Sequence, residues 1–182
     1  MGSDAAIAQL SAAEARAAIP ALAQVLVDCV EGGASVHFMR PFTQAEAEAF
    51  FAKVADQVER GEAVLFVARV GGRILGTVQL GLDTPPNQQH RAEIKKMLVH
   101  RDARRLGLGA ALLTAAEQAA PRFGRTLLVL DTVLGAEGER LYTRGGWNRA
   151  GVIPDYALLP NGGLCATVYF YKRVGPGAGA TP

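Results

Sequence analysis

The chain has 182 residues, 49% of them hydrophobic and 20% charged, and its formal net charge is +2 at pH 7. This composition predicts one globular domain with a real core, and the near-neutral charge gives nucleic-acid binding no electrostatic support. No stretch is long and apolar enough to cross a bilayer, and the N-terminus lacks the segments of a secretory signal. We therefore expect a cytoplasmic protein with no nucleic-acid or membrane partner.

The N-terminal part of the chain predicts a strand followed by helices. Residues 5–10 are a candidate first strand, although Ala and Gln are poor strand formers. Ser11 and Glu14 fit a capping box that starts a helix, and Pro20 either interrupts that helix or opens a second one. The residues after Pro20 share one apolar helical face, which consists of Leu22, Val25, Leu26, Cys29 and Val30.

A loop over residues 34–41 separates these helices from the next one. Phe38 in this loop follows no clear period, so it either plugs the core or lines a substrate site. Thr43 and Glu46 form a second capping box, and Gly61 ends the helix that starts there. The expected buried face of that helix consists of Phe50, Phe51, Val54 and Val58.

The rest of the chain alternates strands with two helices. Strands are predicted at residues 63–70, 73–82, 92–99, 126–133, 147–153 and 165–174, and helices at 106–123 and 137–144. Gly71-Gly72 indicates a two-residue hairpin turn, and the Leu- and Val-rich run at 126–133 is typical of a central, buried strand. A loop that contains Pro154, Tyr156 and Pro160 separates the last two strands.

Helices inserted between strands favour an α/β (α+β) fold with a mixed, mostly antiparallel, twisted sheet and helices on both faces. We expect one domain over residues 5–174, with disordered termini at 1–4 and 175–182. Cys29 and Cys165 could form one disulfide, but two free thiols in a reducing compartment are favoured. No group of His, Cys and Asp has metal-ligand spacing, so no metal is expected.

Residues 96–113 combine the end of an apolar strand, a charged turn and two glycines that open an Ala- and Leu-rich helix. The first amides of a helix lack intrahelical partners and, with the helix dipole, form a site for phosphate. Arg104 and Arg105 add positive charge beside it. Neither the GxxxxGK[ST] loop nor the G-x-G-x-x-G fingerprint fits, because no Lys-Ser or Lys-Thr follows Gly109 and position 112 is Leu.

The remaining pattern, Arg104-x-x-Gly107-x-Gly109 after a strand, resembles the acetyl-CoA pyrophosphate loop of the GCN5-related N-acetyltransferase (GNAT) family. Many members of that family carry Pro where this chain has Arg101 and Gly where it has Arg105. The order of predicted elements is also that of the GNAT fold, so the resemblance covers nearly the whole chain. It requires residues 5–10 to be the first strand.

The resemblance implies acetyl-CoA as acyl donor, with no metal. Backbone groups at the end of the strand would contact the pantetheine arm, and a nearby amide would polarise the thioester carbonyl. The loop would hold the pyrophosphate. The implied cofactor-binding residues are Met97, Leu98, Val99, Arg104, Arg105, Leu106, Gly107, Leu108, Gly109 and Ala110.

Four short segments resemble the tabtoxin resistance acetyltransferases, which inactivate a small amino-acid toxin: Gly32-Gly33-Ala34-Ser35-Val36, Arg91-Ala92-Glu93, Leu130-Asp131-Thr132 and Pro154-x-Tyr156. They imply a small-molecule amine acceptor, such as an amino-acid-like toxin or antibiotic, and a role in resistance. A protein N-terminus or lysine is the alternative acceptor, and a non-catalytic acyl-CoA-binding module is the alternative function. A homodimer is left open.

The family resemblance places Tyr142, on the helix at 137–144, near the thioester sulfur. Its phenol could protonate the departing thiolate, since the ordinary pKa values of the two groups are close; otherwise Tyr142 packs with its hydroxyl at the surface. The implied substrate-binding residues are Asp131, Tyr156 and Phe38. The histidines sit in no pattern that indicates a site and are expected to be structural: His37, His90 and His100.

Two carboxylates are candidates for handling the proton of the acceptor amine. Asp131 interrupts an apolar strand, where a carboxylate needs a partner. It binds the substrate ammonium, accepts a proton through water, or holds Thr132 and the backbone. Glu93, on the strand that enters the glycine loop, is the second candidate; its alternative is an exposed edge charge beside Lys95 and Lys96.

Overall fold

The computed structural model describes residues 5–175, so the disorder predicted for residues 1–4 and 176–182 lies outside the described range. Its strands are β1 (Ala5–Leu10), β2 (Ala63–Val70), β3 (Arg73–Gly81), β4 (Arg91–Val99), β5 (Leu127–Val133), β6 (Asn148–Leu158) and β7 (Leu164–Arg173). Its helices are α1 (Ala12–Ala17), α2 (Ile19–Glu31), α3 (Gln44–Glu59), α4 (Leu108–Ala119) and α5 (Glu137–Arg144), with 3-10 turns at Pro86–Gln88, Arg101–Ala103 and Ala120–Phe123. None of these helices within residues 5–175 is long and apolar enough to cross a membrane.

The predicted helix starts in the N-terminal part are confirmed. In both capping boxes the N-cap hydroxyl accepts from a backbone amide while the glutamate accepts from the N-cap amide, at Ser11 with Glu14 and at Thr43 with Glu46. Pro20 lies in the first turn of α2, so it opens a second helix rather than interrupting the first. The first strand also forms, because β1 pairs along its whole length with β2.

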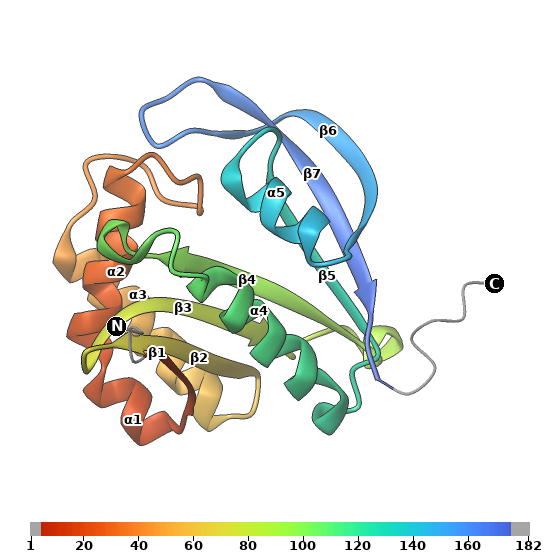
Figure 1. Cartoon of the computed structure of the whole chain (residues 1–182), viewed down its shortest axis with the longest axis horizontal. Coiled ribbons are helices and arrows are strands. Elements are labelled where there is room, and N and C mark those ends of the chain that lie inside the picture. Colours follow the sequence, from red (N-terminus) through yellow and green to blue (C-terminus); the bar gives the residue numbers. More distant parts are fainter. Residues whose placement is uncertain (1–4, 176–182) are drawn as a thin grey trace.

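The seven strands form one sheet in the order β1-β2-β3-β4-β5-β7-β6 (Figure 1). Every neighbouring pair is antiparallel except β4 and β5, which run parallel. The predicted mixed, mostly antiparallel sheet is therefore confirmed. β4 and β5 pair only over Arg91–Glu93 and Leu127–Val129, and beyond these residues the two strands diverge.

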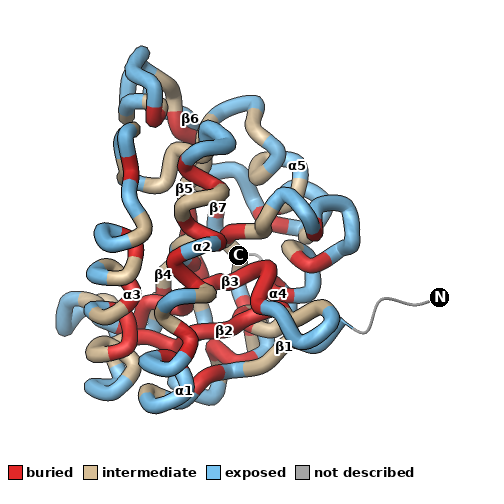
Figure 2. The backbone as a smooth tube through the Cα atoms, turned by 90° about the vertical axis from the view of Figure 1, so that its left-hand side faces the viewer, coloured by how far each residue is buried: buried red, intermediate tan, exposed pale blue. Residues whose placement is uncertain are grey.

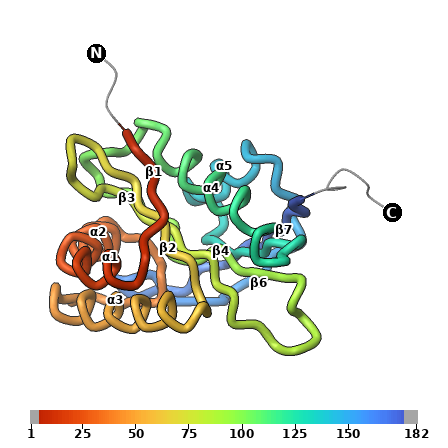
Figure 3. Tube along the Cα trace, turned by 90° about the horizontal axis from the view of Figure 1, so that it is seen from below, coloured from red at the N-terminus to blue at the C-terminus, as the bar shows by residue number. Residues whose placement is uncertain are grey.

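Each face of the sheet has its own hydrophobic core, because successive side chains of a strand point to opposite faces. Leu65 and Val67 of β2 pack with α1, α2 and α3, whereas Val64 and Phe66 pack with α4 and α5. Figure 3 shows the two groups of helices on opposite sides of the sheet. The buried backbone gathers around β2, β3 and α4 (Figure 2). Helices on both faces are thus confirmed.

Three expectations about element boundaries and burial are wrong. The helix predicted at 106–123 is shorter, because α4 passes into a 3-10 turn at Ala120, where Pro121 lacks an amide hydrogen. Pro154 and Tyr156 lie in β6 and not in a loop; β6 is an edge strand with a bulge at this point, where proline is tolerated. β5 buries only Leu128 and Leu130, since its other face borders the divergence from β4.

Candidate active site

The loop between β4 and α4 has an unusual backbone. Arg104 is extended, Arg105 has φ +64°, and Gly107 has φ +77° and is the N-cap of α4. Glycine adopts this left-handed region without steric cost. A Cβ on Gly107 would meet nothing within 4 Å, so the residue is required for its conformation and not for space.

The loop leaves a run of amide donors unused. Within residues 5–175 the backbone amides of residues 105–110 have no acceptor, and the first amide of α4 that has one is Ala111, which donates to the Gly107 carbonyl at 3.1 Å. The side chains of Arg104 and Arg105 are exposed beside this run. Consecutive amides at the positive end of a helix dipole bind phosphate well. This arrangement fits a pyrophosphate.

Gly109 is needed for the close packing of α5 against the first turn of α4. A Cβ there would lie 3.3 Å from Cδ2 of Leu141, so a side chain at this position would push α5 away from the first turn of α4. The two glycines of the sequence motif thus have different physical reasons. Gly107 sets the backbone path, and Gly109 lets α5 approach the loop.

Asp28 of α2 anchors the start of the loop. Its carboxylate accepts from the backbone amide of Arg101 at 2.9 Å and also from the Arg101 guanidinium. His100 lies 3.6 Å from the same carboxylate. Arg101, which departs from the proline common in the GNAT pattern, therefore ties the loop to a helix far away in the sequence. Sequence reasoning had no signal for this contact.

The end of β4 offers backbone groups to the gap between β4 and β5. The amide of His100 donates to the Leu75 carbonyl at 2.8 Å, and Leu98 pairs with Thr77. Because hydrogen-bonded positions alternate along an antiparallel strand, the backbone groups of Val99 turn away from β3. They face the side from which β5 has diverged. Among the described residues, the Val99 carbonyl accepts a hydrogen bond only from the weak thiol donor of Cys29, at 3.6 Å.

A β-bulge in β4 changes the direction of the side chains before the loop. Val78 of β3 lies opposite both Lys96 and Met97, and Lys96 has φ +48°. As a result Lys95 and Lys96 both project to the face covered by α3, where Glu93 also lies. β4 is the fourth of seven strands, so Glu93 is not an edge charge; its carboxylate lies 3.3 Å from the ammonium of Lys95.

Asp131 projects to the same face as Glu93, since Leu128 and Leu130 point to the opposite core. Its Oδ2 lies 2.8 Å from the hydroxyl of Thr167, which also lies 2.9 Å from the Thr132 carbonyl. One hydroxyl proton serves only one of these acceptors at a time. The carboxylate thus has one shared neutral partner and no ion pair within residues 5–175, and a second charged partner would stabilise it.

Tyr156 and Tyr169 extend this face. Tyr169 pairs with Asp131 across β5 and β7, and its hydroxyl lies 2.7 Å from that of Tyr156. The hydrogen bond with Tyr156 raises the pKa of Tyr169, with burial and the charge of Asp131 adding to the effect. Tyr156, a predicted substrate residue, therefore contacts the residue of β7 that lies opposite Asp131.

Tyr142 lies on the opposite face, in the core formed with α4. It is buried and packs between Trp147 and Phe170, with ring centroids 5.9 and 6.0 Å away. Its hydroxyl makes no hydrogen bond in the part of the chain that the structure describes. Burial raises the pKa of Tyr142, and the negative charge of Asp131 raises it further, so the phenol stays protonated at neutral pH.

Phe38 packs on Phe42 and Phe50, with ring centroids 4.4 and 5.3 Å away, and its ring centroid lies 5.7 Å from the ammonium of Lys96. The substrate role of Phe38 stays a prediction. Lys96 and its hydrogen-bond partner His37 were missed by the sequence analysis, which left His37 as structural. Only the bulge brings these two residues together.

The four non-glycine residues with positive φ in residues 5–175 are His37, Lys96, Arg105 and Asp155. Arg105 lies in the loop, Lys96 and His37 contact each other, and Asp155 directly precedes Tyr156 in β6. Such strained positions concentrate at functional sites. This clustering is independent of the side-chain chemistry and marks the same region.

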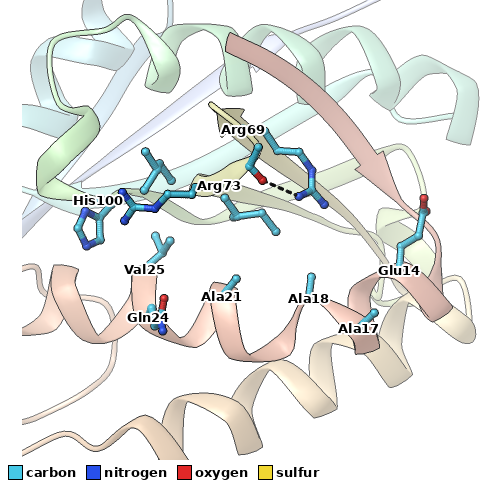
Figure 4. Close-up of a pocket in the computed structure, with 12 residues that line it drawn as sticks. Glu14, Ala17, Ala18, Ala21, Gln24, Val25, Arg69, Arg73 and His100 are labelled. Carbon is cyan, nitrogen blue, oxygen red and sulfur yellow. Dashed lines mark hydrogen bonds between the residues drawn. The ribbon is translucent and has the colours of Figure 1, made fainter. Parts of the chain in front are cut away.

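A separate groove of about 360 Å³ lies between α1 and α2 on one side and the β2–β3 hairpin on the other. Figure 4 shows Arg69, Arg73 and His100 above it and the small side chains of the helices below. It touches the candidate site only through His100.

Both cysteines are free thiols, as the sequence analysis favoured, and burial raises the pKa of Cys29 to about 11.

Comparison with known proteins matches residues 34–147 to the model of the acetyltransferase (GNAT) family. An N-acetyltransferase from Staphylococcus aureus Mu50 has a similar structure, with a TM-score of 0.79 and 20% identity over 95% of this chain and 100% of that chain. A putative acetyltransferase from Salmonella typhimurium, solved with its cofactor acetyl-CoA, has a TM-score of 0.79 and 18% identity, over 99% of this chain and 98% of that chain.

A third solved structure, also from Salmonella typhimurium, is an acetyl transferase that modifies the N-terminal serine of ribosomal protein L7/L12. It is similar to this chain with a TM-score of 0.75 and 16% identity, over 93% of this chain and 95% of that chain. At these identities the structures support the fold and leave the acceptor open.

Proposed function

Because the chain belongs to the acetyltransferase (GNAT) family and is thus an acetyl-CoA-dependent N-acetyltransferase, we propose that it acetylates the amine of a small molecule by direct attack on the thioester. The observation that carries this proposal is the position of the amide-rich loop at the end of β4, beside a face that carries Asp131, Glu93 and two tyrosines. Bound acetyl-CoA supplies an acyl group that an uncharged amine can attack.

For the donor, we assign the pyrophosphate to the free amides of residues 105–110, with Arg104 and Arg105 neutralising its charge. The backbone of Val99, turned into the gap beside β4, and that of neighbouring Met97 would align the pantetheine arm. Fixing two reactants in line supplies much of the rate of such a reaction.

Tyr142 is the residue that we propose near the thioester sulfur. The sequence argument relied on a phenol and a thiol with similar pKa values, and burial widens that difference. The hydroxyl would therefore act first as a hydrogen-bond donor to the sulfur. As negative charge develops on the sulfur, this hydrogen bond strengthens and stabilises the departing thiolate.

Asp131 is the residue that we propose to meet the acceptor ammonium. Its carboxylate has one neutral hydrogen-bond partner, Thr167, so a cationic amine would complete its environment. Glu93 is already close to Lys95, which makes it the weaker candidate for the base.

A small acceptor is favoured by a bridge over this face. The loop at 34–41 is bonded to the turn between β6 and β7: the amide of Arg40 donates to the Pro160 carbonyl at 2.9 Å, its guanidinium to Asn161 at 2.8 Å, and the Ser35 hydroxyl to the Leu158 carbonyl at 3.2 Å. Figure 1 shows this loop approaching that turn. This bridge restricts the access of a folded protein to the face that carries Asp131. The short matches to tabtoxin resistance acetyltransferases support an amino-acid-like toxin or antibiotic.

The alternative acceptor is a protein N-terminus or lysine; the L7/L12-modifying neighbour acts on an N-terminal serine. A free-thiol assay with acetyl-CoA separates the two on one plate of amines, amino acids and short peptides. We expect turnover with small amines or amino acids and little with peptides. Turnover with peptides alone would contradict the small-molecule proposal, and acetyl-CoA binding without turnover would indicate a non-catalytic module.

Two further parts of the proposal concern location and assembly. The free thiols Cys29 and Cys165 are consistent with the cytoplasm. We also propose that the protein forms a homodimer, because exposed apolar side chains on the β6–β7 hairpin could pack against a second copy. These side chains are Val152, Ile153, Leu158 and Leu164. Light scattering on the purified protein tests it: a monomer at micromolar concentration would contradict it.

A further inference from the structure

Lys96 is a half-buried cation that forms no ion pair in the part of the chain that the structure describes. Its ammonium lies 5.7 and 5.6 Å from the ring centroids of Phe38 and Phe50, within cation–π range. It contacts Nδ1 of His37 at 2.9 Å and forms no ion pair within residues 5–175. A buried ammonium normally has a carboxylate partner, because desolvating an unpaired charge is costly.

The cost of burying this charge also affects the pKa values of Lys96 and His37. Burial and, to a smaller extent, the charge of Lys95 together lower the pKa of Lys96 to about 8, against weaker opposing effects of Glu93 and Asp131. The pKa of His37 is lowered too, chiefly by Lys96. An anion placed beside Lys96 would relieve both.

The protein holds the two residues together at a conformational cost. Lys96 has φ +48° at the bulge, and His37 has φ +77° in the loop at 34–41. Non-glycine residues occupy this region at a cost that surrounding structure must offset. Both ends of the contact are strained, which is not expected of a merely tolerated lysine.

The contact between Lys96 and His37 also determines which hydrogen-bond donors remain available to a ligand. Because an ammonium has no lone pair, Lys96 donates to Nδ1 of His37, and a neutral His37 then has its single N–H at Nε2. His37 is exposed, which leaves that donor accessible. On the same face of β3, opposite Lys95, the buried Gln79 has an Nε2 atom without a partner in the described chain.

We propose that Lys96 and His37 form a binding subsite for a carboxylate of the acceptor. This inference rests on the proposed function and narrows it: with an ammonium at Asp131 and a carboxylate at Lys96, the acceptor is a small zwitterion of the amino-acid class. Lys96 binds and orients the acceptor, while proton transfer stays with Asp131 or Glu93.

The test compares acceptors that differ only in the carboxylate. Each standard L-amino acid is assayed beside its decarboxylated amine, with wild type, Lys96→Met and Lys53→Met. Lys53 is an exposed lysine on α3 and serves as the matched control. Melting temperatures show that each variant is folded; Lys96→Met removes an unpaired charge and keeps the length of the side chain.

For wild type and Lys53→Met we expect kcat/KM for the preferred amino acid to exceed that for its amine at least about 100-fold, since sites built for a polar group reject analogues that lack it. Lys96→Met should reduce this ratio to near one by raising KM for the amino acid, with the amine unaffected. If wild type uses the amines equally well, or if Lys96→Met lowers both acceptors alike, the carboxylate subsite is wrong while the small-molecule function stands. If no small amine reacts, the proposed function fails and this inference with it.

Discussion

The two halves of the candidate site are built from different parts of the chain. The loop between β4 and α4 presents main-chain amides from six consecutive residues, 105–110. The proposed acceptor face, which carries Glu93, Lys96, Asp131, Tyr156 and Tyr169, instead uses side chains from β4, β5, β6, β7 and the loop at 34–41, which meet only in the fold. A main-chain site is set by backbone conformation and a side-chain site by long-range packing. The two halves should therefore respond to different substitutions.

The largest expected effect comes from the backbone of the loop. Gly107→Val places a β-branched residue at φ +77°, where it is strained at about 1–3 kcal/mol unless the loop moves. Movement would turn the amides away, so we expect acetyl-CoA affinity to fall at least about 100-fold, or about 3 kcal/mol. Calorimetric titration measures the affinity.

Gly124→Val is the matched control for Gly107→Val. Gly124 has φ +69°, and a Cβ there would also meet nothing within 4 Å, but it lies after α4, outside the candidate site. It should lose similar stability and keep its affinity. Equal affinities in the two folded variants would refute the loop assignment.

Asp131→Asn should change acceptor handling by about 100-fold in kcat/KM and leave acetyl-CoA affinity unchanged. A rise in acceptor KM would indicate ammonium binding, whereas a lower kcat with an altered pH profile would indicate proton transfer. The amide is nearly isosteric and can still bond to Thr167. A lower melting temperature with normal acceptor kinetics would assign Asp131 a structural role only.

Tyr142→Phe should lower kcat by roughly 30-fold, below the usual contribution of a matched general acid, because burial raises the phenol pKa. The ring stays packed between Trp147 and Phe170, so stability should change little. Single-turnover kinetics report the chemical step. Wild-type kinetics there would leave Tyr142 as a packing residue.

The last expected effect is on the stability of the fold. Lys96 has a folded pKa of about 8, below the 10.5 of a free lysine, so the unfolded chain binds more protons between these values and stability rises with pH through that window. His37, Lys95, Glu93 and Asp131 face it and are shared by both proteins. In denaturant unfolding from pH 7 to 10.5, the free energy of unfolding of wild type should rise relative to that of Lys96→Met. A constant difference would mean that Lys96 has an ordinary pKa.

The same contrast explains what the sequence could predict. The capping boxes, the hairpin turn at Gly71-Gly72 and the loop around Gly107 depend on neighbouring residues, and all formed as expected. The strand across Pro154 was missed, because pairing with β7 overrides the local turn signal. The Lys96–His37 contact depends on a bulge and a bond across 59 residues, and the Asp28 anchor on one across 73.

The most direct test of the division into a main-chain and a side-chain half is acetyl-CoA titration of the double variant Asp131→Asn, Lys96→Met. This variant removes both charged groups assigned to the acceptor and leaves residues 105–110 intact. The account predicts a dissociation constant within about twofold of wild type, alongside loss of amino-acid acetylation. A loss of affinity greater than about tenfold, or 1.4 kcal/mol, would contradict it, because the donor would then depend on the acceptor side chains.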